Sequence, residues 1–380
     1  MKYPITRLGI IGGGQLARMT ALAAIPMGVH VSVLEKGPNA PACGIADRHI
    51  DGSLYDPQKL RQLVESCEVT TYDIEHTDTQ TLIALAREGH RILPSPTLLA
   101  TIQDKYVQKK HLADHGLPVP RFDNCQAPTP DTLRAFGLPL VQKAREGGYD
   151  GRGVQLIRTE ADLGQLIPAP SLLEACVDIE TELAVLVARD LSGDVRCYPV
   201  VEMVFDDANN ILDMLIAPAR ISAALAAEAE ALAVAAVRAL DGVGIFAVEL
   251  FLDKQGQLLV NEIAPRPHNS GHFTIEACPT SQYAQHVRAV CGLPLGSTRQ
   301  SHPAVMLNLL GAPGFSGSPR INGLRKTLAL ENVFVHLYGK AETRPARKMG
   351  HVTILGETLE EALAKSEKVQ QWLTITAEEV

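Results

Sequence analysis

The 380-residue chain lacks a long apolar run and lacks an excess of positive charge. No stretch approaches the ~18 consecutive apolar residues of a membrane-spanning helix. The net charge of −8 disfavours non-specific binding to nucleic acid, which needs a basic surface. The seven cysteines include no Cys-x-x-Cys pair, so neither a zinc site nor a disulfide framework is indicated. The start has no signal-peptide pattern, and we expect a cytoplasmic protein.

The order of strand and helix patterns predicts an α/β and α+β protein of two or three domains. A strand over 7–11, a helix over 15–24 and a strand over 29–35 begin a parallel α/β domain at residues 1–98. One helix is expected from 97 to about 115. The central region, 99–295, includes a small strand-rich lobe at about 118–178. A small β-rich domain with a closing helix is expected at 296–380.

Two further elements are predicted inside the central region. Ser222 is a suitable N-cap for an alanine-rich helix that continues to Leu240. Strands over 244–252 and 257–263 flank the sequence Asp-Lys-Gln-Gly and are expected to form a hairpin.

A glycine-rich turn follows the first strand. Gly12, Gly14 and Ala17 fit the pattern G-x-G-x-x-G/A, and Glu35 lies where an acid that binds ribose belongs in dinucleotide-binding proteins. By itself this pattern favours a dinucleotide cofactor. The same backbone N–H groups at a helix start could also bind one phosphate of a substrate, or the turn could be purely structural.

A second glycine-rich segment lies between two strand-like segments at 147–153. Four glycines in seven residues allow the backbone to fold over phosphates. Lys143 precedes this flap and could reach a phosphate, while Asp150 and Arg152 lie within it. The alternative is a mobile surface loop.

Glu249 and Glu262 lie on the two strands of the predicted hairpin. A two- or four-residue loop centred between Lys254 and Gln255 pairs Glu249 with Val260, and Glu262 becomes its diagonal neighbour on the same face. Two carboxylates that face the same way favour a cation between them, and Mg2+ with phosphate oxygens suits oxygen ligands. Two solvated glutamates are the alternative.

Two further clusters indicate anion or substrate binding. Polar side chains in a loop directly after the second hairpin strand have a location suited to substrate rather than to core packing: Arg266, His268, Asn269 and His272. A basic segment near the C-terminus could bind phosphate, or be a solvated turn: Lys340, Arg344, Arg347 and Lys348.

In this order the motifs resemble the ATP-grasp superfamily and, within it, the 5-(carboxyamino)imidazole ribonucleotide synthetases of purine biosynthesis. The resemblance spans nearly the whole chain. It rests on the segments GGGQLARM (12–19), TYDIEHTD (71–78), KAREGGYDGRGV (143–154), NEIAPRPHNSGH (261–272) and HLYGKAETRPARKMGH (336–351). The implied fold has an N-terminal α/β domain, a two-lobed ATP-grasp region and a small C-terminal domain, which matches the division above.

The resemblance also implies roles for individual residues. ATP would contact Lys105, Lys143, the flap Gly148, Tyr149, Asp150, Gly151, Arg152, Gly153 and Val154, the segment Glu174, Ala175, Cys176 and Val177, and also Glu182, Asn261 and Glu262. Glu249 and Glu262 would bind Mg2+. The substrate 5-aminoimidazole ribonucleotide would contact Gln15, Leu16, Glu75, Tyr149, Asp150, Arg266, Asn269, Lys340, Arg347 and Lys348. Arg152, His268 and Lys348 would hold bicarbonate and the carboxylated intermediate.

The implied reaction joins bicarbonate to the γ-phosphate of ATP and transfers the carboxyl group to the exocyclic amine of the substrate. The proton acceptor is open among Asp150, His268 and phosphate. One departure from the family is Phe205, where a histidine near the nucleotide is usual. The resemblance suggests a homodimer.

Three rival interpretations use fewer of these motifs. A formate-dependent glycinamide ribonucleotide ligase belongs to the same superfamily, but the flap of that enzyme is of a serine-glycine-lysine type. A dinucleotide-dependent oxidoreductase would use only the N-terminal turn. A non-catalytic nucleotide-binding subunit is the third, and Phe205 is the residue that keeps it open.

Overall fold

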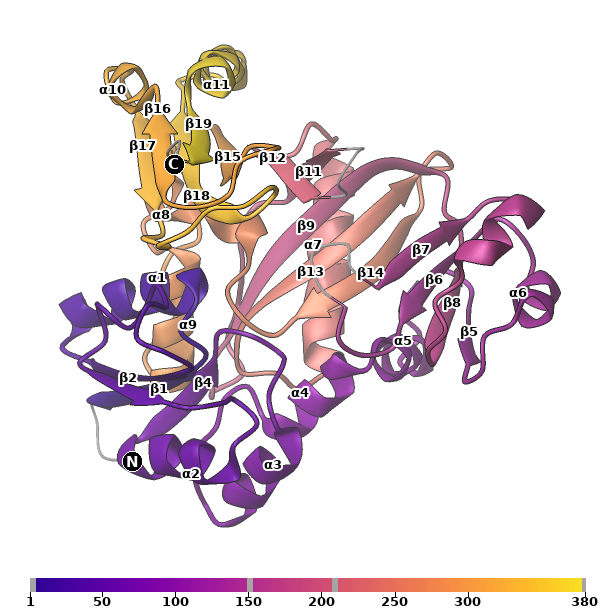
Figure 1. The fold of residues 1–380 in the computed structure, drawn as a ribbon, viewed down its shortest axis with the longest axis horizontal. Coiled ribbons are helices and arrows are strands. Elements are labelled where there is room, and N and C mark those ends of the chain that lie inside the picture. Colours follow the sequence, from indigo (N-terminus) through magenta and orange to yellow (C-terminus); the bar gives the residue numbers. More distant parts are fainter. Residues whose placement is uncertain (1–4, 149–152, 207–210, 378–380) are drawn as a thin grey trace.

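The computed structural model describes residues 5–148, 153–206 and 211–377. Within them the strands form four sheets. In Figure 1 the N-terminal domain, a small sheet and the C-terminal part surround the large central sheet. No helix of the described residues is long and apolar enough to cross a membrane.

The N-terminal domain is a parallel four-stranded sheet in the order β3-β2-β1-β4, as the alternating pattern predicted. Its apolar strands are buried under helices on both faces, which is usual for parallel sheets. The elements are β1 (Arg7–Ile11), α1 (Gln15–Ala24), η1 (Ile25–Met27), β2 (His30–Glu35), β3 (Arg48–Asp51), α2 (Pro57–Ser66), β4 (Val69–Tyr72) and α3 (Thr79–Arg87).

The single helix expected from 97 to about 115 was wrong, because the chain forms two helices. They are α4 (Pro96–Gln103) and α5 (Lys105–Asp114). Asp104 ends α4 in an extended conformation (φ −96°, ψ 109°), and its carboxylate accepts hydrogen bonds from the backbone N–H groups of Tyr106 and Val107. An aspartate in this conformation is a strong N-cap, so it starts a new helix in a new direction.

The small sheet is antiparallel, in the order β5-β8-β6-β7. It packs one face on α6 and on a short 3-10 helix around Leu133, Leu140 and Leu173. The elements are β5 (Phe122–Cys125), α6 (Pro130–Phe136), β6 (Leu140–Ala144), β7 (Val154–Ile157), η2 (Glu160–Gln165) and β8 (Ser171–Ala175).

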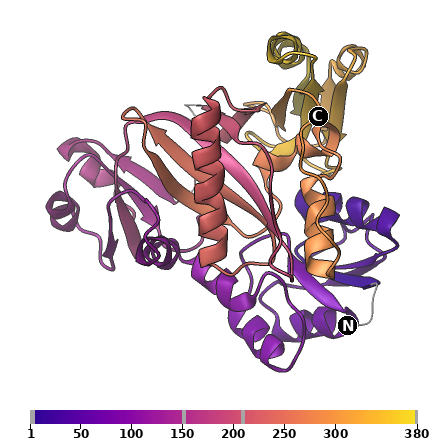
Figure 2. The same cartoon turned by 180° about the vertical axis from the view of Figure 1, so that it is seen from behind.

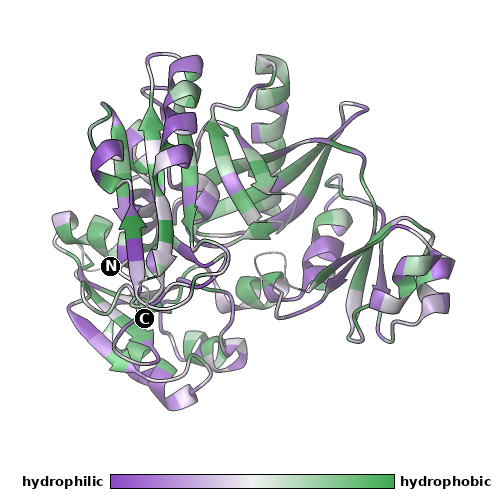
Figure 3. Ribbon diagram, turned by 45° about the horizontal axis from the view of Figure 1, so that its top comes forward, coloured by the Kyte–Doolittle hydropathy of each residue, from purple (hydrophilic) through white to green (hydrophobic). Residues whose placement is uncertain are grey.

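The large sheet has the order β14-β13-β9-β11-β12-β15-β18-β17, with β10 beside β9. Its long strands are mostly hydrophobic in Figure 3. The strands are β9 (Ile179–Arg189), β10 (Val195–Cys197), β11 (Val201–Asp206), β12 (Ile211–Ala217), β13 (Gly244–Asp253), β14 (Leu258–Ala264), β15 (Ala304–Leu310), β17 (Val333–Leu337) and β18 (Lys348–Leu355).

Helix α7 (Ala223–Ala239) covers one face of this sheet, as Figure 2 shows from behind. The Ser222 side chain accepts a hydrogen bond from the Leu225 N–H, so the predicted N-cap is confirmed. Small residues such as Ala229, Ala233 and Ala236 are fully buried and let the helix lie close to Val185 and Val248 of the sheet.

The sheet runs on from the central region into the C-terminal part. Met214 to Ala217 of β12 pair with Leu307 to Ala304 of β15, so the expected boundary at 295/296 separates neighbouring strands of one sheet. The other elements after β14 are η3 (Asn269–Gly271), α8 (Thr274–Ala277), α9 (Gln282–Cys291), β16 (Pro319–Asn322), α10 (Leu324–Thr327), α11 (Leu359–Trp372) and β19 (Thr374–Ala377).

Helix α9 joins the central region to the N-terminal domain. Val287, Val290 and Cys291 of this helix belong to the same buried cluster as Ala17 and Ala21 of α1. Residues more than 260 positions apart therefore pack together, and α9 lies against the N-terminal domain.

Candidate active site

The β13–β14 hairpin brings Glu249 and Glu262 together. The predicted pairing of Glu249 with Val260 was wrong: Glu249 lies directly opposite Glu262, and Leu250 lies opposite Val260. A bulge at Asn261 adds one residue to β14 between these pairs. Leu252 pairs with Leu258, and the Asp253 N–H donates to the Gln257 carbonyl at 3.0 Å, so three residues, Lys254 to Gly256, close the turn where a two- or four-residue loop was expected.

The two carboxylates differ strongly in protonation. Burial and the neighbouring carboxylates Glu262 and Glu182 raise the pKa of Glu249. The Lys105 ammonium, which forms an ion pair with Glu262, lowers the pKa of that carboxyl. The Glu249 side chain is 15% exposed and the Glu262 side chain 40% exposed, so the pair faces an opening and not the core.

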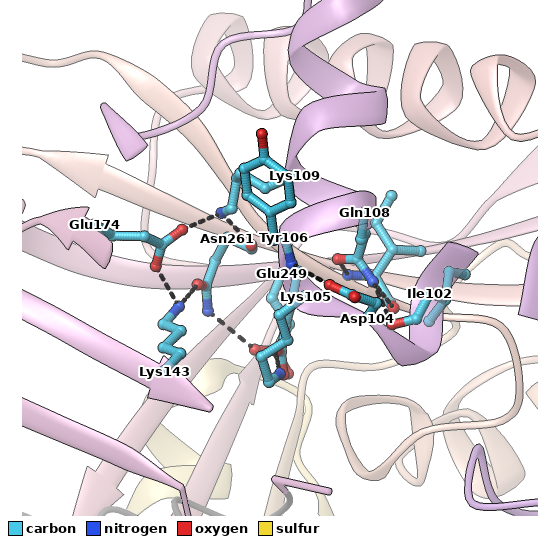
Figure 4. Close-up of polar contacts among 12 residues, drawn as sticks. Ile102, Asp104, Lys105, Tyr106, Gln108, Lys109, Lys143, Glu174, Glu249 and Asn261 are labelled. Atoms are coloured by element: carbon cyan, nitrogen blue, oxygen red, sulfur yellow. Dashed lines mark hydrogen bonds and ion pairs between the residues drawn. The ribbon is translucent and has the colours of Figure 1, made fainter. Parts of the chain in front are cut away.

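Helix α5 holds the strand that carries Glu262. The buried Gln108 side chain donates to the Ile263 carbonyl at 3.2 Å and accepts from the Ile263 N–H at 3.0 Å. Lys109 Nζ donates to the carbonyls of Val260 and Asn261 at 3.1 and 2.5 Å. Because β14 is an edge strand, these side chains satisfy backbone groups that have no neighbouring strand, and they fix the bulge (Figure 4).

Glu174, at the small sheet, forms ion pairs with two lysines. Its oxygens lie 2.7 Å from Lys109 Nζ and 2.6 Å from Lys143 Nζ. Burial opposes ionisation, but the two lysines lower the pKa of Glu174 to about 2. Lys143 also donates to Asn261 Oδ1 at 2.9 Å, and Asn261 Nδ2 reaches Glu249 at 3.5 Å. Figure 4 shows this chain of contacts from the small sheet to the hairpin.

Lys109 is a site residue that the sequence reasoning missed. Burial lowers its pKa to about 8 against the attraction of Glu174. Its spacing of four residues from Lys105 puts both lysines on one face of α5, and this spacing is the signal that could have identified it.

The flap is hinged on β6 and β7 of the small sheet. Lys143 pairs with Val154, the Ala144 N–H donates to the Gly153 carbonyl at 2.7 Å, and Gly153 adopts φ +73°. Gly148 follows β6 and Gly153 precedes β7, so both ends of the flap lie between two strands, as the glycine pattern predicted. The expectations for Tyr149, Asp150, Gly151 and Arg152 lie outside the described residues.

The segment after β8 leads from this hairpin toward Glu182. The Ala175 N–H donates to the Arg121 carbonyl, the Cys176 N–H donates to the Pro139 carbonyl, and Cys176 is exposed. Val177 follows and is half-buried. Glu182 lies on β9; burial raises its pKa to about 7, against the attraction of Lys143.

Phe205 lies on β11, two residues beyond Met203, which pairs with Glu182. Its half-buried ring packs on the apolar cluster that contains Met203 and Leu212. The phenyl ring therefore fills hydrophobic space on a strand next to Glu182, where a histidine would add a polar group.

The loop 266–272 joins the hairpin to the N-terminal domain. Arg266 Nε lies 2.9 Å from Glu75 Oε1, and His268 Nε2 lies 3.6 Å from Glu249 Oε1. The buried Gln282 accepts from the His268 N–H at 2.9 Å and donates to its carbonyl at 2.7 Å. This amide holds the backbone of the loop, so His268 reaches the carboxylate pair from a fixed position.

The N-terminal glycine turn is occupied by a carboxylate of the same chain. Asp73 accepts hydrogen bonds from the Gly14 N–H at 2.5 Å and the Ala17 N–H at 2.8 Å, and Glu35 accepts from the Gly13 N–H at 2.9 Å. These are the groups that would bind a pyrophosphate. Of the interpretations given for this turn, the structural one fits these contacts.

The C-terminal motif lies beside the N-terminal motif. Leu16 of α1 packs with Tyr283 and Tyr338, and the Tyr338 hydroxyl hydrogen-bonds His351 at 2.9 Å. Gln15 precedes Leu16 at the start of the same helix.

The basic residues predicted to bind phosphate, Lys340, Arg347 and Lys348, belong to the same C-terminal motif. Lys340 Nζ donates to the Lys348 carbonyl at 2.7 Å, and Arg347 donates to the Glu342 carbonyl at 2.7 Å. The rings of His272 and His351 lie 4.4 Å apart, so β18, which begins at Lys348, lies beside the loop 266–272.

Three domains therefore contribute to one region: the N-terminal turn, the hairpin with its loop, and the C-terminal basic segment. Among the described residues there is no group of three or more His, Cys, Asp and Glu side chains arranged to hold a metal. The Glu249–Glu262 pair with Asn261 fits an ion such as Mg2+, which commonly takes one or two carboxylates and completes its shell with phosphate oxygens and water.

Comparison with known families divides the chain in the same order. Residues 5–103 match the ribonucleotide synthetase preATP-grasp domain, 110–283 match the ATP-grasp domain, and 304–365 match the phosphoribosylaminoimidazole carboxylase C-terminal domain. Together they define the ATP-grasp class of proteins.

Comparison with individual proteins identifies relatives within the ATP-grasp class. An N5-carboxyaminoimidazole ribonucleotide synthase of Synechococcus elongatus is 41% identical over 92% of this chain and 90% of its own length. A phosphoribosylaminoimidazole carboxylase of Ogataea methanolica is 40% identical, and the match covers 93% of this chain but 67% of that longer protein.

Solved structures agree with these relatives. The N5-carboxyaminoimidazole ribonucleotide synthetase of Thermotoga maritima has 49% identity and a TM-score of 0.92, covering 98% of this chain and all of that one (100%). An Aspergillus clavatus enzyme in complex with ADP and 5-aminoimidazole ribonucleotide has 35% identity and a TM-score of 0.88, with 97% and 98% covered. The chain belongs to the N5-carboxyaminoimidazole ribonucleotide synthase family.

Proposed function

We propose that this protein is an ATP-dependent carbon-nitrogen ligase that carboxylates 5-aminoimidazole ribonucleotide with bicarbonate in purine biosynthesis. The observation that carries the proposal is the Glu249–Glu262 pair, with Lys105 and Lys143 beside it and the glycine hairpin opposite. Family membership and the relative bound to ADP and 5-aminoimidazole ribonucleotide support the choice of substrates.

The reaction has two steps. A bicarbonate oxygen attacks the γ-phosphorus of ATP, ADP leaves, and carboxyphosphate forms. The exocyclic amine of the substrate then attacks the carboxyl carbon, phosphate leaves with its electron pair, and the amine loses one proton. The product is 5-(carboxyamino)imidazole ribonucleotide, together with ADP and phosphate.

ATP would bind between the small sheet and the large sheet. Lys105 and Lys143 would contact its phosphates, with the flap from Gly148 to Val154 above them; Glu182 would contact the ribose, and residues 174–177 the adenine. The Glu174 carboxylate is already paired with Lys109 and Lys143, so it acts by holding those lysines, and residues 175–177 are left for adenine.

Glu249 and Glu262 would bind Mg2+, with Asn261 adjacent. The ion would neutralise phosphate charge as bicarbonate approaches. Burial and the nearby carboxylates Glu262 and Glu182 raise the pKa of Glu249, and a bound divalent cation would offset this unfavourable effect on the ionised form.

The second substrate would lie where the three domains meet. Its contacts would come from Gln15, Leu16, Glu75, Arg266 and Asn269, and its phosphate would bind Lys340, Arg347 and Lys348. The Arg266–Glu75 ion pair supports this location because it links the loop after β14 to the N-terminal domain. Arg152, His268 and Lys348 would hold bicarbonate and the intermediate.

The proton acceptor stays a choice among Asp150, His268 and the departing phosphate. His268 has support from position, since its Nε2 lies 3.6 Å from Glu249 and its backbone is clamped by Gln282. The homodimer and the cytoplasmic location stay predictions; light scattering on the purified protein tests the first.

One assay separates the proposal from its rivals. ADP formation is measured with 5-aminoimidazole ribonucleotide plus bicarbonate, and in parallel with glycinamide ribonucleotide plus formate. We expect turnover with the first pair. Turnover only with the second pair would overturn the assignment, and no ADP with either pair would favour a non-catalytic subunit.

A further inference from the structure

Asn269 is a buried amide with one unused acceptor. The residue is 7% exposed, its Nδ2 donates to Asn308 Oδ1 at 3.0 Å, and its Oδ1 is buried without a hydrogen-bond partner. A buried polar atom left in this state is destabilising, so proteins seldom retain one without a use.

The orientation of this amide is determined from the backbone outward. The Leu212 carbonyl can only accept, so the Asn308 side chain must present its Nδ2 to it, at 2.6 Å. Asn308 then has only its Oδ1 for Asn269. Asn269 must therefore donate with its Nδ2, and its Oδ1 is the atom left for another molecule.

Asn308 lies on β15, one residue past the Leu307–Met214 pair between β15 and β12. It is itself 7% exposed. The sheet that continues from β12 into β15 thus brings a C-terminal residue against the loop after β14, far from it in sequence.

We propose that Asn308 is a positioning residue that locks Asn269 as a hydrogen-bond acceptor, so that Asn269 contacts an N–H or O–H group of the substrate and not a phosphate or carboxylate oxygen. The inference rests on the proposed function and deepens it. In 5-aminoimidazole ribonucleotide the groups of this kind are the exocyclic amine and the ribose hydroxyls, whereas the phosphate of that substrate presents acceptors and belongs elsewhere.

Two variants of Asn308 test the proposal. Asn308→Leu removes the acceptor that Asn269 needs, while Asn308→Asp keeps it; both lose the amide that donates to Leu212. We expect Asn308→Leu to raise the KM for 5-aminoimidazole ribonucleotide about 10-fold, the scale of one hydrogen bond. Asn308→Asp should raise it less than about threefold, and the KM for ATP should stay within about twofold in both.

The control is Asn322→Leu, which removes hydrogen bonds to Thr374 and Thr376 in the outer two-stranded sheet and should leave both KM values unchanged. Equal effects of Leu and Asp at 308, an equal rise in both KM values, or no rise with Leu would overturn the proposal. If Asn308→Leu does not fold, Asn308→Ala replaces it. Wild-type turnover in the same assay reports separately on the proposed function.

Discussion

Glu262 is an ionised carboxylate beside a second carboxylate that resists ionisation. We predict that Glu262→Gln lowers turnover by about 100-fold or more, because one of the two carboxylates proposed to bind Mg2+ is lost. The fold should persist, since Gln can still accept from Lys105. Turnover at saturating Mg2+ and circular dichroism measure the two effects.

The matched control for this variant is Glu228→Gln, an exposed glutamate on α7. Its turnover should equal that of the wild type. Near-normal turnover of Glu262→Gln would remove Glu262 from the metal and phosphate site.

Glu182 gives a prediction about how the stability of the protein depends on pH. Its folded-state pKa is raised from 4.5 to about 7 by burial, so its contribution to stability is complete below pH 4.5 and is lost as the pH rises to about 7. Glu182→Gln has no charge to lose. Its Tm relative to wild type should therefore increase from pH 4.5 to 7 and then level off.

Thermal unfolding without nucleotide at several pH values measures this difference. A Tm difference that does not change with pH would contradict it. If Glu182 also contacts the ribose, the same variant should raise the KM for ATP and leave the KM for 5-aminoimidazole ribonucleotide unchanged.

At the scale of elements, the start of α1 depends on the carboxylate of Asp73, the residue that follows β4. Asp73 uses both oxygens, one for Gly14 and one for Ala17. Asp73→Asn keeps one acceptor and turns an amide N–H toward the other backbone N–H. We expect a loss of about 1–3 kcal/mol in the free energy of unfolding, measured by urea titration.

Asp56→Asn is the comparison for this effect. Asp56 caps α2 at a half-buried position and uses only Oδ1, for the N–H groups of Gln58 and Lys59. Asparagine caps a helix about as well as aspartate, so this variant should unfold like the wild type. Equal stability of both variants would show that Asp73 does not hold the turn.

On the scale of the whole molecule, the continuous large sheet joins the central and C-terminal parts. Ala304 and Met306 of β15 share a core cluster with Ala184 and Leu186 of β9. A chain that stops at residue 298 would expose the edge of β12 and this cluster. We predict that this truncated chain fails to fold and aggregates, because an exposed apolar strand edge pairs with other chains.

A chain nicked between 296 and 301 is the control, because both parts stay together through the β12–β15 pairing. It should unfold in one transition, at a temperature close to that of the intact chain. A truncated chain that is folded and monomeric by size exclusion would contradict the prediction.

The sequence alone predicted the elements whose signals are local. The parallel N-terminal layer follows from apolar strands between helical patterns, and the start of α7 follows from Ser222. Comparison with known families confirmed the ATP-grasp fold and the family resemblance, which rested on motif segments distributed along the chain.

Only the tertiary structure decided contacts between distant residues. The bulge at Asn261 depends on α5, whose Gln108 and Lys109 bind the backbone of an edge strand. The glycine turn has a nucleotide-binding pattern, but Asp73 arrives from 59 positions away and occupies it. Local propensity determines where a strand or helix begins, whereas register and the partner of a buried polar group depend on which segments pack together.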